Sequence, residues 1–244
     1  TDPKSPAAEA FRTLRTNLVF SSLDMPLQTL MVTAPTQDAD SANKSITIAN
    51  LAATMAQSGT KTLLVDCDLR RPHQHEIWTV ANDKGITTTL IHGGDLPLTD
   101  VGIENLTVLT SGPEPSNPAD LLGSHKMERL IQSMKEKADL VLFDAPPLLA
   151  VTDAALLASK LDGILLVLSA GKTRRDHAAQ AKQLLDRVNI RIVGAVLNNA
   201  TLDARVGSSD VSETESVEAE QGQFVEIHTP MARKAYTTDG YVFG

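Results

Sequence analysis

The chain has 244 residues, of which 42% are hydrophobic, and a formal net charge of −8 at pH 7. This length fits one large α/β domain with a substantial core, and the acidic balance argues against a nucleic-acid surface or an anionic membrane as the main partner. The single cysteine, Cys67, excludes an intrachain disulfide and is typical of a reducing compartment.

The predicted elements begin with an amphipathic helix over residues 5–22. Short apolar runs then predict strands at 29–33, 62–66, 106–109, 140–144, 164–169 and 192–197. Helix-period segments separate many of them, at 44–58, 124–137, 153–160 and 174–188. Most of the strand segments are near-continuously apolar, which suits strands buried on both faces of a parallel sheet. The alternation predicts an α/β fold with a doubly wound, mostly parallel sheet and right-handed crossovers.

The chain divides into three predicted regions. Residues 1–28 carry the N-terminal helix, residues 29–200 form the α/β core, and residues 201–244 read as a flexible acidic tail without a clear period. The only tyrosines, Tyr236 and Tyr241, lie in that tail. Because the chain starts without a methionine, we expect a piece of a longer protein, whose remainder can include a membrane segment.

Acidic side chains stand where two predicted strands end. The strand at 62–66 runs into Asp66 and Asp68, and the strand at 140–144 ends at Asp144. Ligands bind at the carboxyl edge of parallel sheets, and such carboxylates can hold Mg²⁺ directly or through water. Aspartate is also a common turn former at strand ends. Three of them together with a Lys-Ser pair favour a nucleotide site.

That pair is Lys44-Ser45, after the loop that follows the first predicted strand. A phosphate loop needs inward backbone N–H groups, a lysine for the β- and γ-phosphates and a hydroxyl for Mg²⁺. Lys44 and Ser45 have the chemistry of the last two. The pattern therefore predicts that they open the helix over 44–58 beside a triphosphate.

Several motifs together resemble the cytoplasmic domain of bacterial tyrosine kinases, P-loop proteins that regulate capsule and exopolysaccharide assembly. Thr62-Leu-Leu-Val-Asp-Cys-Asp-Leu-Arg-Arg-Pro72 resembles their second acidic motif, and Leu140-Val-Leu-Phe-Asp-Ala-Pro-Pro147 looks like their Walker B region. Lys44-Ser-Ile-Thr-Ile-Ala-Asn-Leu-Ala52 is similar to the start of their first core helix. The resemblance covers about residues 3–200 in the family's order.

The resemblance implies a set of site roles for ATP and Mg²⁺. Lys44 would bind the β- and γ-phosphates, and Ser45 would hold Mg²⁺. Asp68 and Asp144 would hold the water shell of the metal, and Asp66 would orient or deprotonate the incoming tyrosine hydroxyl. Catalysis would then consist of positioning and charge neutralisation.

Further residues carry weaker implications. Arg70 and Arg71 would assist with phosphate or subunit contacts. Asn198, at the end of the last predicted strand, would read the adenine base, although it is equally compatible with an ordinary turn. Tyr236 and Tyr241 would be the phosphate acceptors, because family members usually end in a tyrosine cluster.

The helix over 5–22 contains Glu9-Ala-Phe-Arg12-Thr-Leu-Arg15, which matches the Glu-x-x-Arg-x-x-Arg oligomerisation motif of the family. In the family these side chains bridge subunits of a ring; the alternative is a solvated surface with weak local ion pairs. The resemblance further implies a homo-oligomer without nucleic acid, at the cytoplasmic face of the bacterial membrane. A membrane chain-length determinant or activator, fused or separate, would be its partner.

The sequence departs from the family in its phosphate loop, which has no glycine between Pro35 and Lys44 and carries Asp38 and Asp40. Glycine lets the backbone approach phosphates closely, and carboxylates there repel a triphosphate. The leading interpretation is an ATP-dependent tyrosine autokinase. The alternative is a pseudokinase that serves as an oligomerisation or regulatory module. A partitioning-type ATPase of the same superfamily is disfavoured, since no second lysine lies between Met31 and Lys44.

Overall fold

The computed structural model describes residues 5–23, 25–37, 41–200 and 223–226. Its centre is one eight-stranded sheet with the order β3-β4-β2-β5-β1-β6-β7-β8. The strands are β1 (Thr29–Thr33), β2 (Thr62–Asp66), β3 (Thr99–Asp100), β4 (Leu106–Leu109), β5 (Leu140–Asp144), β6 (Gly163–Ser169), β7 (Ile192–Asn198) and β8 (Gln223–Glu226). All neighbouring pairs are parallel except β3 with β4. The predicted doubly wound, mostly parallel sheet is confirmed.

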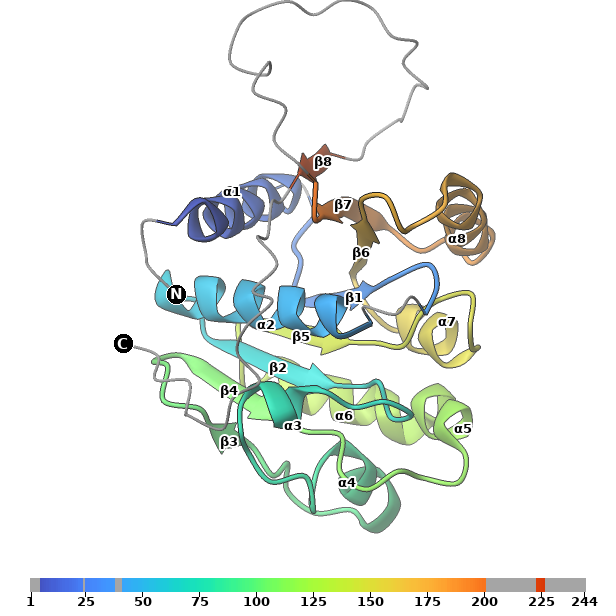
Figure 1. Cartoon of the computed structure of the whole chain (residues 1–244). Helices are drawn as coiled ribbons and strands as arrows, with labels where there is room; N and C mark the ends of the chain where they lie inside the picture. Colours follow the sequence, from blue (N-terminus) through green and yellow to red (C-terminus); the bar gives the residue numbers. More distant parts are fainter. Residues whose placement is uncertain (1–4, 24, 38–40, 201–222, 227–244) are drawn as a thin grey trace, which may run out of the picture.

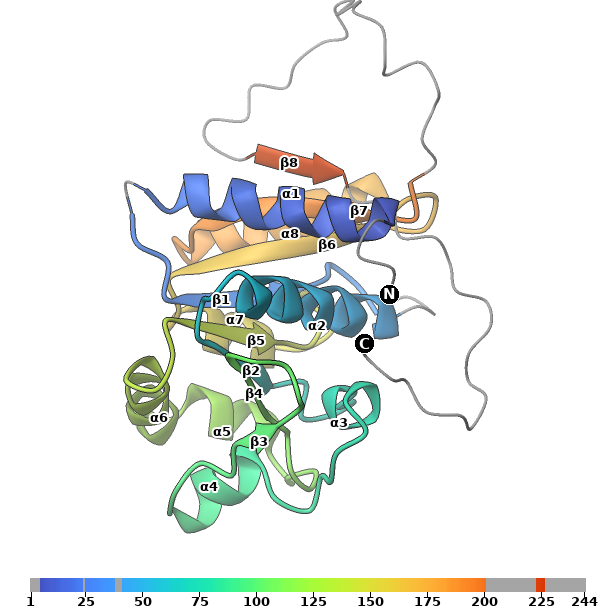
Figure 2. The same ribbon diagram turned by 90° about the vertical axis from the view of Figure 1, so that its left-hand side faces the viewer.

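Helices cover both faces of this sheet (Figures 1 and 2). They are α1 (Pro6–Ser21), α2 (Ser41–Gln57), α3 (Gln74–Ile77), α4 (Ile86–His92), α5 (Pro118–Gly123), α6 (His125–Lys135), α7 (Asp153–Ala158) and α8 (Arg175–Arg187). One buried apolar cluster joins the sheet to α1 and α2, and a second joins it to α4, α5, α6, α7 and α8. Central strands are therefore buried on both sides, which explains their continuous apolar sequences.

The N-terminal helix forms for local reasons that the sequence contains. The Ser5 hydroxyl accepts a hydrogen bond from the backbone N–H of Ala8 at 3.2 Å and so caps α1, with Pro6 in its first turn. Phe11, Leu14 and Leu18 share one face and are buried against α2 and the sheet. This leaves the polar face of α1, with the predicted Glu-Arg-Arg motif, at the surface.

Predicted and observed elements differ mainly in short segments. The six predicted strands and five predicted helices are present, with ends shifted by a few residues. The predictions omitted α3, α4 and α5, which have four, seven and six residues and too few turns for a visible period. They also omitted β3 at one edge. The stretch Gln223–Glu226, assigned to a structureless tail, pairs as β8 with β7, a correction for those four residues.

Among the described residues, no helix has the length and apolar character needed to cross a membrane.

The strand order determines where a ligand could bind. After β5, which lies between β2 and β1, the chain continues to β6 on the other side of β1. Strand connections diverge at such a reversal and leave a crevice beyond the carboxyl ends of the strands. The residues that follow β1, β2 and β5 are the ones expected to line it.

Candidate functional site

The acidic side chains of the two strand ends lie next to each other. Asp66 and Asp144 are register partners on the neighbouring strands β2 and β5. The backbone N–H of Cys67 donates to the Asp144 carbonyl at 2.8 Å, which continues the ladder beyond the strand ends. Asp66 and Asp144 are fully buried and Asp68 is 6% exposed. Three carboxylates are thus held together at the predicted edge of the sheet.

Lys44 projects from the first turns of α2 into this acidic group. Its ammonium lies 2.5 Å from Asp144 Oδ1, 2.5 Å from the Ala145 carbonyl and 3.4 Å from Asp68 Oδ2. The side chain is 2% exposed. A buried ammonium needs such partners because desolvation disfavours its charged form. The structure therefore brings the predicted phosphate-binding lysine onto the predicted metal-binding carboxylates.

The pKa values of the cluster reflect burial first and the charges of its neighbours second. Burial raises the pKa of Asp66 well above its usual range, and the neighbouring Asp144 raises it further. Burial also raises the pKa of Asp68, against the opposing effect of Lys44. Burial alone would lower the pKa of Lys44, but Asp144 and Asp68 outweigh it, so that pKa is raised. When all three carboxylates are ionised, the Lys44 ammonium leaves two negative charges unbalanced, and a divalent cation would balance them.

Ser45 supplies the observation that fits Mg²⁺. Its hydroxyl is fully buried beside Lys44 and has no hydrogen-bond partner among the described residues. A buried hydroxyl without a partner is costly, and an oxygen-seeking cation at this point would satisfy it. No group of three or more Asp, Glu, His or Cys in the described ranges forms a complete metal cage. Mg²⁺ does not require one, since it is commonly held by one or two carboxylates together with water and substrate phosphates.

Asp66 also organises the backbone around the site. Its Oδ1 accepts from the backbone N–H of Asp68 at 3.2 Å, and its Oδ2 accepts from the N–H groups of His73 and Gln74 at 3.1 and 2.9 Å. These bonds fold the chain after β2 back toward the sheet and start α3. Its role toward a tyrosine hydroxyl stays a prediction, in which the carboxylate would act from a fully buried position.

Gln74 belongs to the site and was missed in the sequence. The side chain is fully buried, and its Nε2 donates to Asp144 Oδ2 at 2.7 Å and to the Ser45 carbonyl at 3.0 Å. Its Oε1 accepts from the indole N–H of Trp78 at 3.1 Å. No motif pointed to this residue; the only available signal was its place shortly after the second acidic motif.

The two arginines of that motif have separate partners. Arg70 makes a two-point contact with the buried Asp153 at the start of α7, at 2.8 and 3.3 Å. The guanidinium of Arg71 faces the Gln37 amide, and with that amide turned so that its oxygen points to Arg71, it donates to the oxygen at 2.8 and 3.0 Å. Arg70 thus ties the second acidic motif to the segment after β5, and Arg71 ties it to the loop after β1. Phosphate or subunit contacts by either residue remain predictions.

Asn198 lies at the end of β7, apart from the carboxylates and against the helix that carries Lys44. Its Nδ2 donates to Thr47 Oγ1 at 2.8 Å. Its Oδ1 is buried and has no hydrogen-bond partner among the described residues. The residue is therefore a free acceptor held in place by α2, and reading of an adenine base stays a prediction.

The phosphate loop is described only at its ends. Helix α2 begins at Ser41, so residues 41–43 are helical and the predicted start at Lys44 is three residues late. The Asn43 carbonyl accepts a hydrogen bond from the Thr47 hydroxyl at 2.7 Å, as helix interiors allow. Asp38 and Asp40 lie outside the described residues. The same holds for Tyr236 and Tyr241.

The predicted oligomerisation motif lies along α1. Glu9 forms an i,i+3 ion pair with Arg12 at 2.7 Å, with 68% and 40% of the two side chains exposed. Arg15 is one turn further and half-buried. The pair is the local arrangement expected of a solvated surface, and it leaves charged groups of both signs accessible to a neighbouring copy. Subunit bridging stays a prediction.

Cys67 has no reactive character. It is fully buried in the apolar cluster, and burial raises the pKa of its thiol well above the usual range, with Asp66 adding to the effect. No cation lowers it enough to form a thiolate. Cys67 is a small buried residue of the core.

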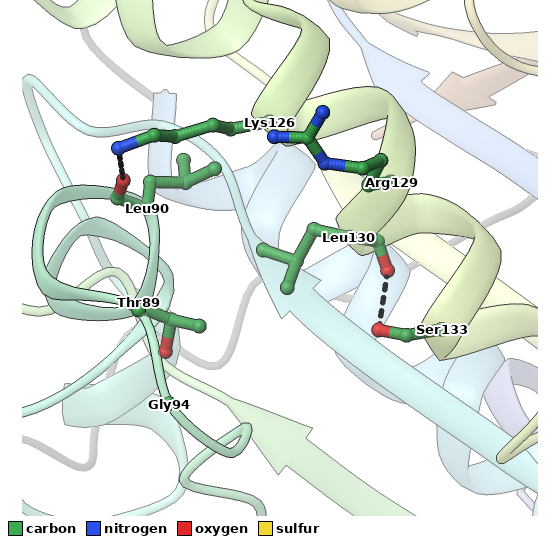
Figure 3. Close-up of a pocket in the computed structure, with 8 residues that line it drawn as sticks. Thr89, Leu90, Gly94, Lys126, Arg129, Leu130 and Ser133 are labelled. Carbon is green, nitrogen blue, oxygen red and sulfur yellow. Dashed lines mark hydrogen bonds between the residues drawn. The ribbon is translucent and has the colours of Figure 1, made fainter.

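A surface hollow of about 270 Å³ lies away from this site, between α4 and α6 (Figure 3). Lys126 and Arg129 are the charged residues of its lining, and no carboxylate contributes to it. The Lys126 ammonium donates to the Leu90 carbonyl at 3.2 Å. None of the predicted site residues lines this hollow, and its donor set does not suit Mg²⁺.

Comparisons with known proteins identify relatives for most of the chain. A family profile described as an AAA domain matches residues 41–191. Tyrosine-protein kinase YwqD of Bacillus subtilis is 41% identical over 204 residues, which cover 83% of this chain and 85% of that protein. The tyrosine-protein kinase etk of Escherichia coli is 35% identical, and there the match spans 27% of the relative's length.

Solved structures agree with these sequence matches. The kinase domain of the Escherichia coli tyrosine kinase ETK superimposes with a TM-score of 0.78 at 34% identity, covering 87% of this chain and 83% of that one. The cell division ATPase MinD of Pyrococcus furiosus reaches a TM-score of 0.58 at 21% identity, covering 70% of this chain and 72% of its own. At this low identity, the similarity to MinD concerns the fold alone.

Proposed function

The chain belongs to the family of bacterial tyrosine-protein kinases, and we propose that it is an ATP-dependent protein-tyrosine autokinase domain that regulates capsule or exopolysaccharide polymerisation or export. The observation that carries the proposal is the buried cluster of Lys44, Asp66, Asp68 and Asp144 beside the unpartnered hydroxyl of Ser45. An ordinary core would not retain three carboxylates around one ammonium.

In this proposal the residues divide the work of phosphoryl transfer. Lys44 would leave the carboxylates to neutralise the β- and γ-phosphates, and Asp144 and Asp68 would hold the metal's water shell. Ser45 would offer its hydroxyl to the metal. Mg²⁺, when bound, supplies the positive charge that offsets the triphosphate and the carboxylate cluster.

Asp66 is proposed to receive or orient the tyrosine hydroxyl of the acceptor. Its raised pKa suits a group that takes up a proton, because a base of very low pKa would have no affinity for one. Tyr236 and Tyr241 are the proposed acceptors. Asn198, through its unpartnered Oδ1, is the proposed contact for the adenine amino group.

The assembly and its place are proposed from the same family membership. Glu9, Arg12 and Arg15 would join copies of the chain into a ring, in which one copy presents its tail to the site of the next. The kinase would act in the cytoplasm at the inner face of the membrane, with a fused or separate membrane activator. The match to only 27% of etk is consistent with a kinase domain that is one part of a larger system in some relatives.

The test is calorimetric titration of the purified chain with Mg·ADP and Mg·ATP, followed by a phosphate-incorporation assay. Micromolar nucleotide affinity and phosphate incorporated at Tyr236 or Tyr241 are expected. A Tyr236→Phe, Tyr241→Phe double variant should bind nucleotide as before and incorporate no phosphate. Absence of binding at millimolar nucleotide would instead favour the pseudokinase, for which the glycine-free loop is the specific argument.

A further inference from the structure

Gln74 is the residue through which three separate parts of the site are joined. It begins α3, and its own backbone N–H is bonded to Asp66 at the end of β2. Its side-chain amide reaches Asp144 at the end of β5 and the Ser45 carbonyl in the first turns of α2. These partners are 70 and 29 residues away along the chain. One residue thus connects the phosphate-loop helix to both acidic strand ends, to Asp144 through its side chain and to Asp66 through its backbone.

The amide orientation is determined by its surroundings. Two acceptors, the Asp144 carboxylate and the Ser45 carbonyl, face the Nε2 group, and the Trp78 indole donor faces Oε1. The opposite orientation would point the carbonyl oxygen at two acceptors. Every polar atom of the side chain therefore has a partner of the right kind, and the amide is locked in place.

The lock fixes the rotation of the Asp144 carboxylate. Its Oδ2 is held by Gln74 at 2.7 Å while its Oδ1 faces Lys44 at 2.5 Å. A neutral amide orients the carboxylate without cancelling its negative charge, whereas a lysine or arginine here would compete with a metal. Residues that orient a metal's ligands from behind are a general feature of metal sites.

We propose that Gln74 is a positioning residue for Mg²⁺: it holds the Asp144 carboxylate and the backbone of Ser45 in the arrangement that the metal requires. This inference rests on the proposed function, because it assumes that Asp144 and Ser45 serve Mg²⁺. It assigns Gln74 no contact with nucleotide or tyrosine. Loss of the amide should therefore weaken metal binding first.

The test measures how much Mg²⁺ is needed for ADP to bind. Calorimetric ADP titrations at a series of Mg²⁺ concentrations give the half-maximal Mg²⁺ requirement of the wild type and of Gln74→Met, which keeps the size of the side chain but has no donor. We expect this requirement to rise by about 10- to 100-fold. Gln132→Met, the same change at an exposed position of α6, is the matched control and should leave the requirement unchanged.

All titrations are made at a temperature where circular dichroism shows each variant to be folded. If Gln74 has only a structural role, Gln74→Met will have a lower melting temperature but the same Mg²⁺ requirement as the wild type. Such a result would overturn the inference. If Gln74→Met does not fold, Gln74→Asn decides, since its shorter amide cannot reach Ser45 and Asp144 together, and an unchanged requirement would again overturn it. A wild type that binds no ADP at any Mg²⁺ concentration would overturn the proposed function itself, before any variant is compared.

Discussion

The ammonium of Lys44 lies 2.5 Å from Asp144 Oδ1, and both side chains are buried inside the protein. The family resemblance assigns Lys44 to phosphates and Asp144 to the metal shell. Here the two groups neutralise each other. In the proposed site, Lys44 and Mg²⁺ would therefore compete for the same carboxylate, and phosphate binding by Lys44 would release Asp144 for the metal.

This competition predicts an unusual phenotype for Lys44→Met. Nucleotide binding and phosphate incorporation should be lost, while free Mg²⁺ should bind more tightly than in the wild type. The variant should also unfold more easily at neutral pH, by about 3 kcal/mol, because it leaves buried carboxylates without their counter-charge. Added Mg²⁺ should restore part of that stability.

Thermal melts with and without Mg²⁺ measure the change in stability, and calorimetric titration with Mg²⁺ alone measures the affinity for the free metal. Lys137→Met, at an exposed position, is the control and should behave as the wild type. Free Mg²⁺ binding that is no tighter in Lys44→Met than in the wild type would contradict the competition.

Ser45→Ala separates metal binding from folding. The hydroxyl has no partner among the described residues, so its removal should leave the stability of the metal-free protein unchanged or slightly higher. The same change should raise the Mg²⁺ requirement for ADP binding. Melts in EDTA and calorimetry at graded Mg²⁺ measure the two effects. A clear loss of stability in EDTA would mean that the hydroxyl has a structural partner.

The charged face of α1 is expected to contribute to self-association. Changing Glu9, Arg12 and Arg15 together to alanine should lower the oligomeric mass measured by light scattering, and high salt should weaken association of the wild type. The exposed pair Arg174 and Asp176, at the start of α8, provides a control of similar chemistry. An unchanged mass in the triple variant would leave this face of α1 as ordinary solvated surface.

A pH-dependent contribution to stability is expected from Glu128 on α6. Hydrogen bonds from Lys160 and then His125 lower the pKa of Glu128 from 4.5 to about 2. A carboxyl whose pKa is lower in the folded state stabilises that state above its unfolded pKa, and the contribution disappears as pH falls through the folded value. Glu128→Gln should therefore unfold at lower urea concentration than the wild type at pH 6.

The difference between the two proteins should shrink as pH falls from about 5 toward 2. Urea titrations at several pH values measure it. Exposed Glu136, on the turn after the same helix, gives the control Glu136→Gln, which should show no such pH-dependent difference. If the difference in urea midpoint between the wild type and Glu128→Gln is the same at pH 3 as at pH 6, Glu128 stabilises the fold through packing and not through its charge.

The sequence by itself determined the layout of the core. Apolar runs such as 62–66 and 140–144 are continuous because both faces of these strands are buried. A continuous apolar run can be recognised from the sequence alone. The motif around Asp66 and the Lys44-Ser45 pair likewise identified the family, which the relatives confirm. Short elements such as α3 remained hidden, since one helical turn has no period to detect.

Only the tertiary structure decided which of these groups meet. The order of strands places β5 beside β2, so Asp144 lies next to Asp66 although 78 positions separate them in the numbering. Lys44 contacts Asp144, and Gln74 donates to the other oxygen of Asp144 from a helix that no sequence pattern predicted. Such contacts depend on how whole elements pack, because a side chain's partners across the sheet are set by strand order and register, which local periodicity does not contain.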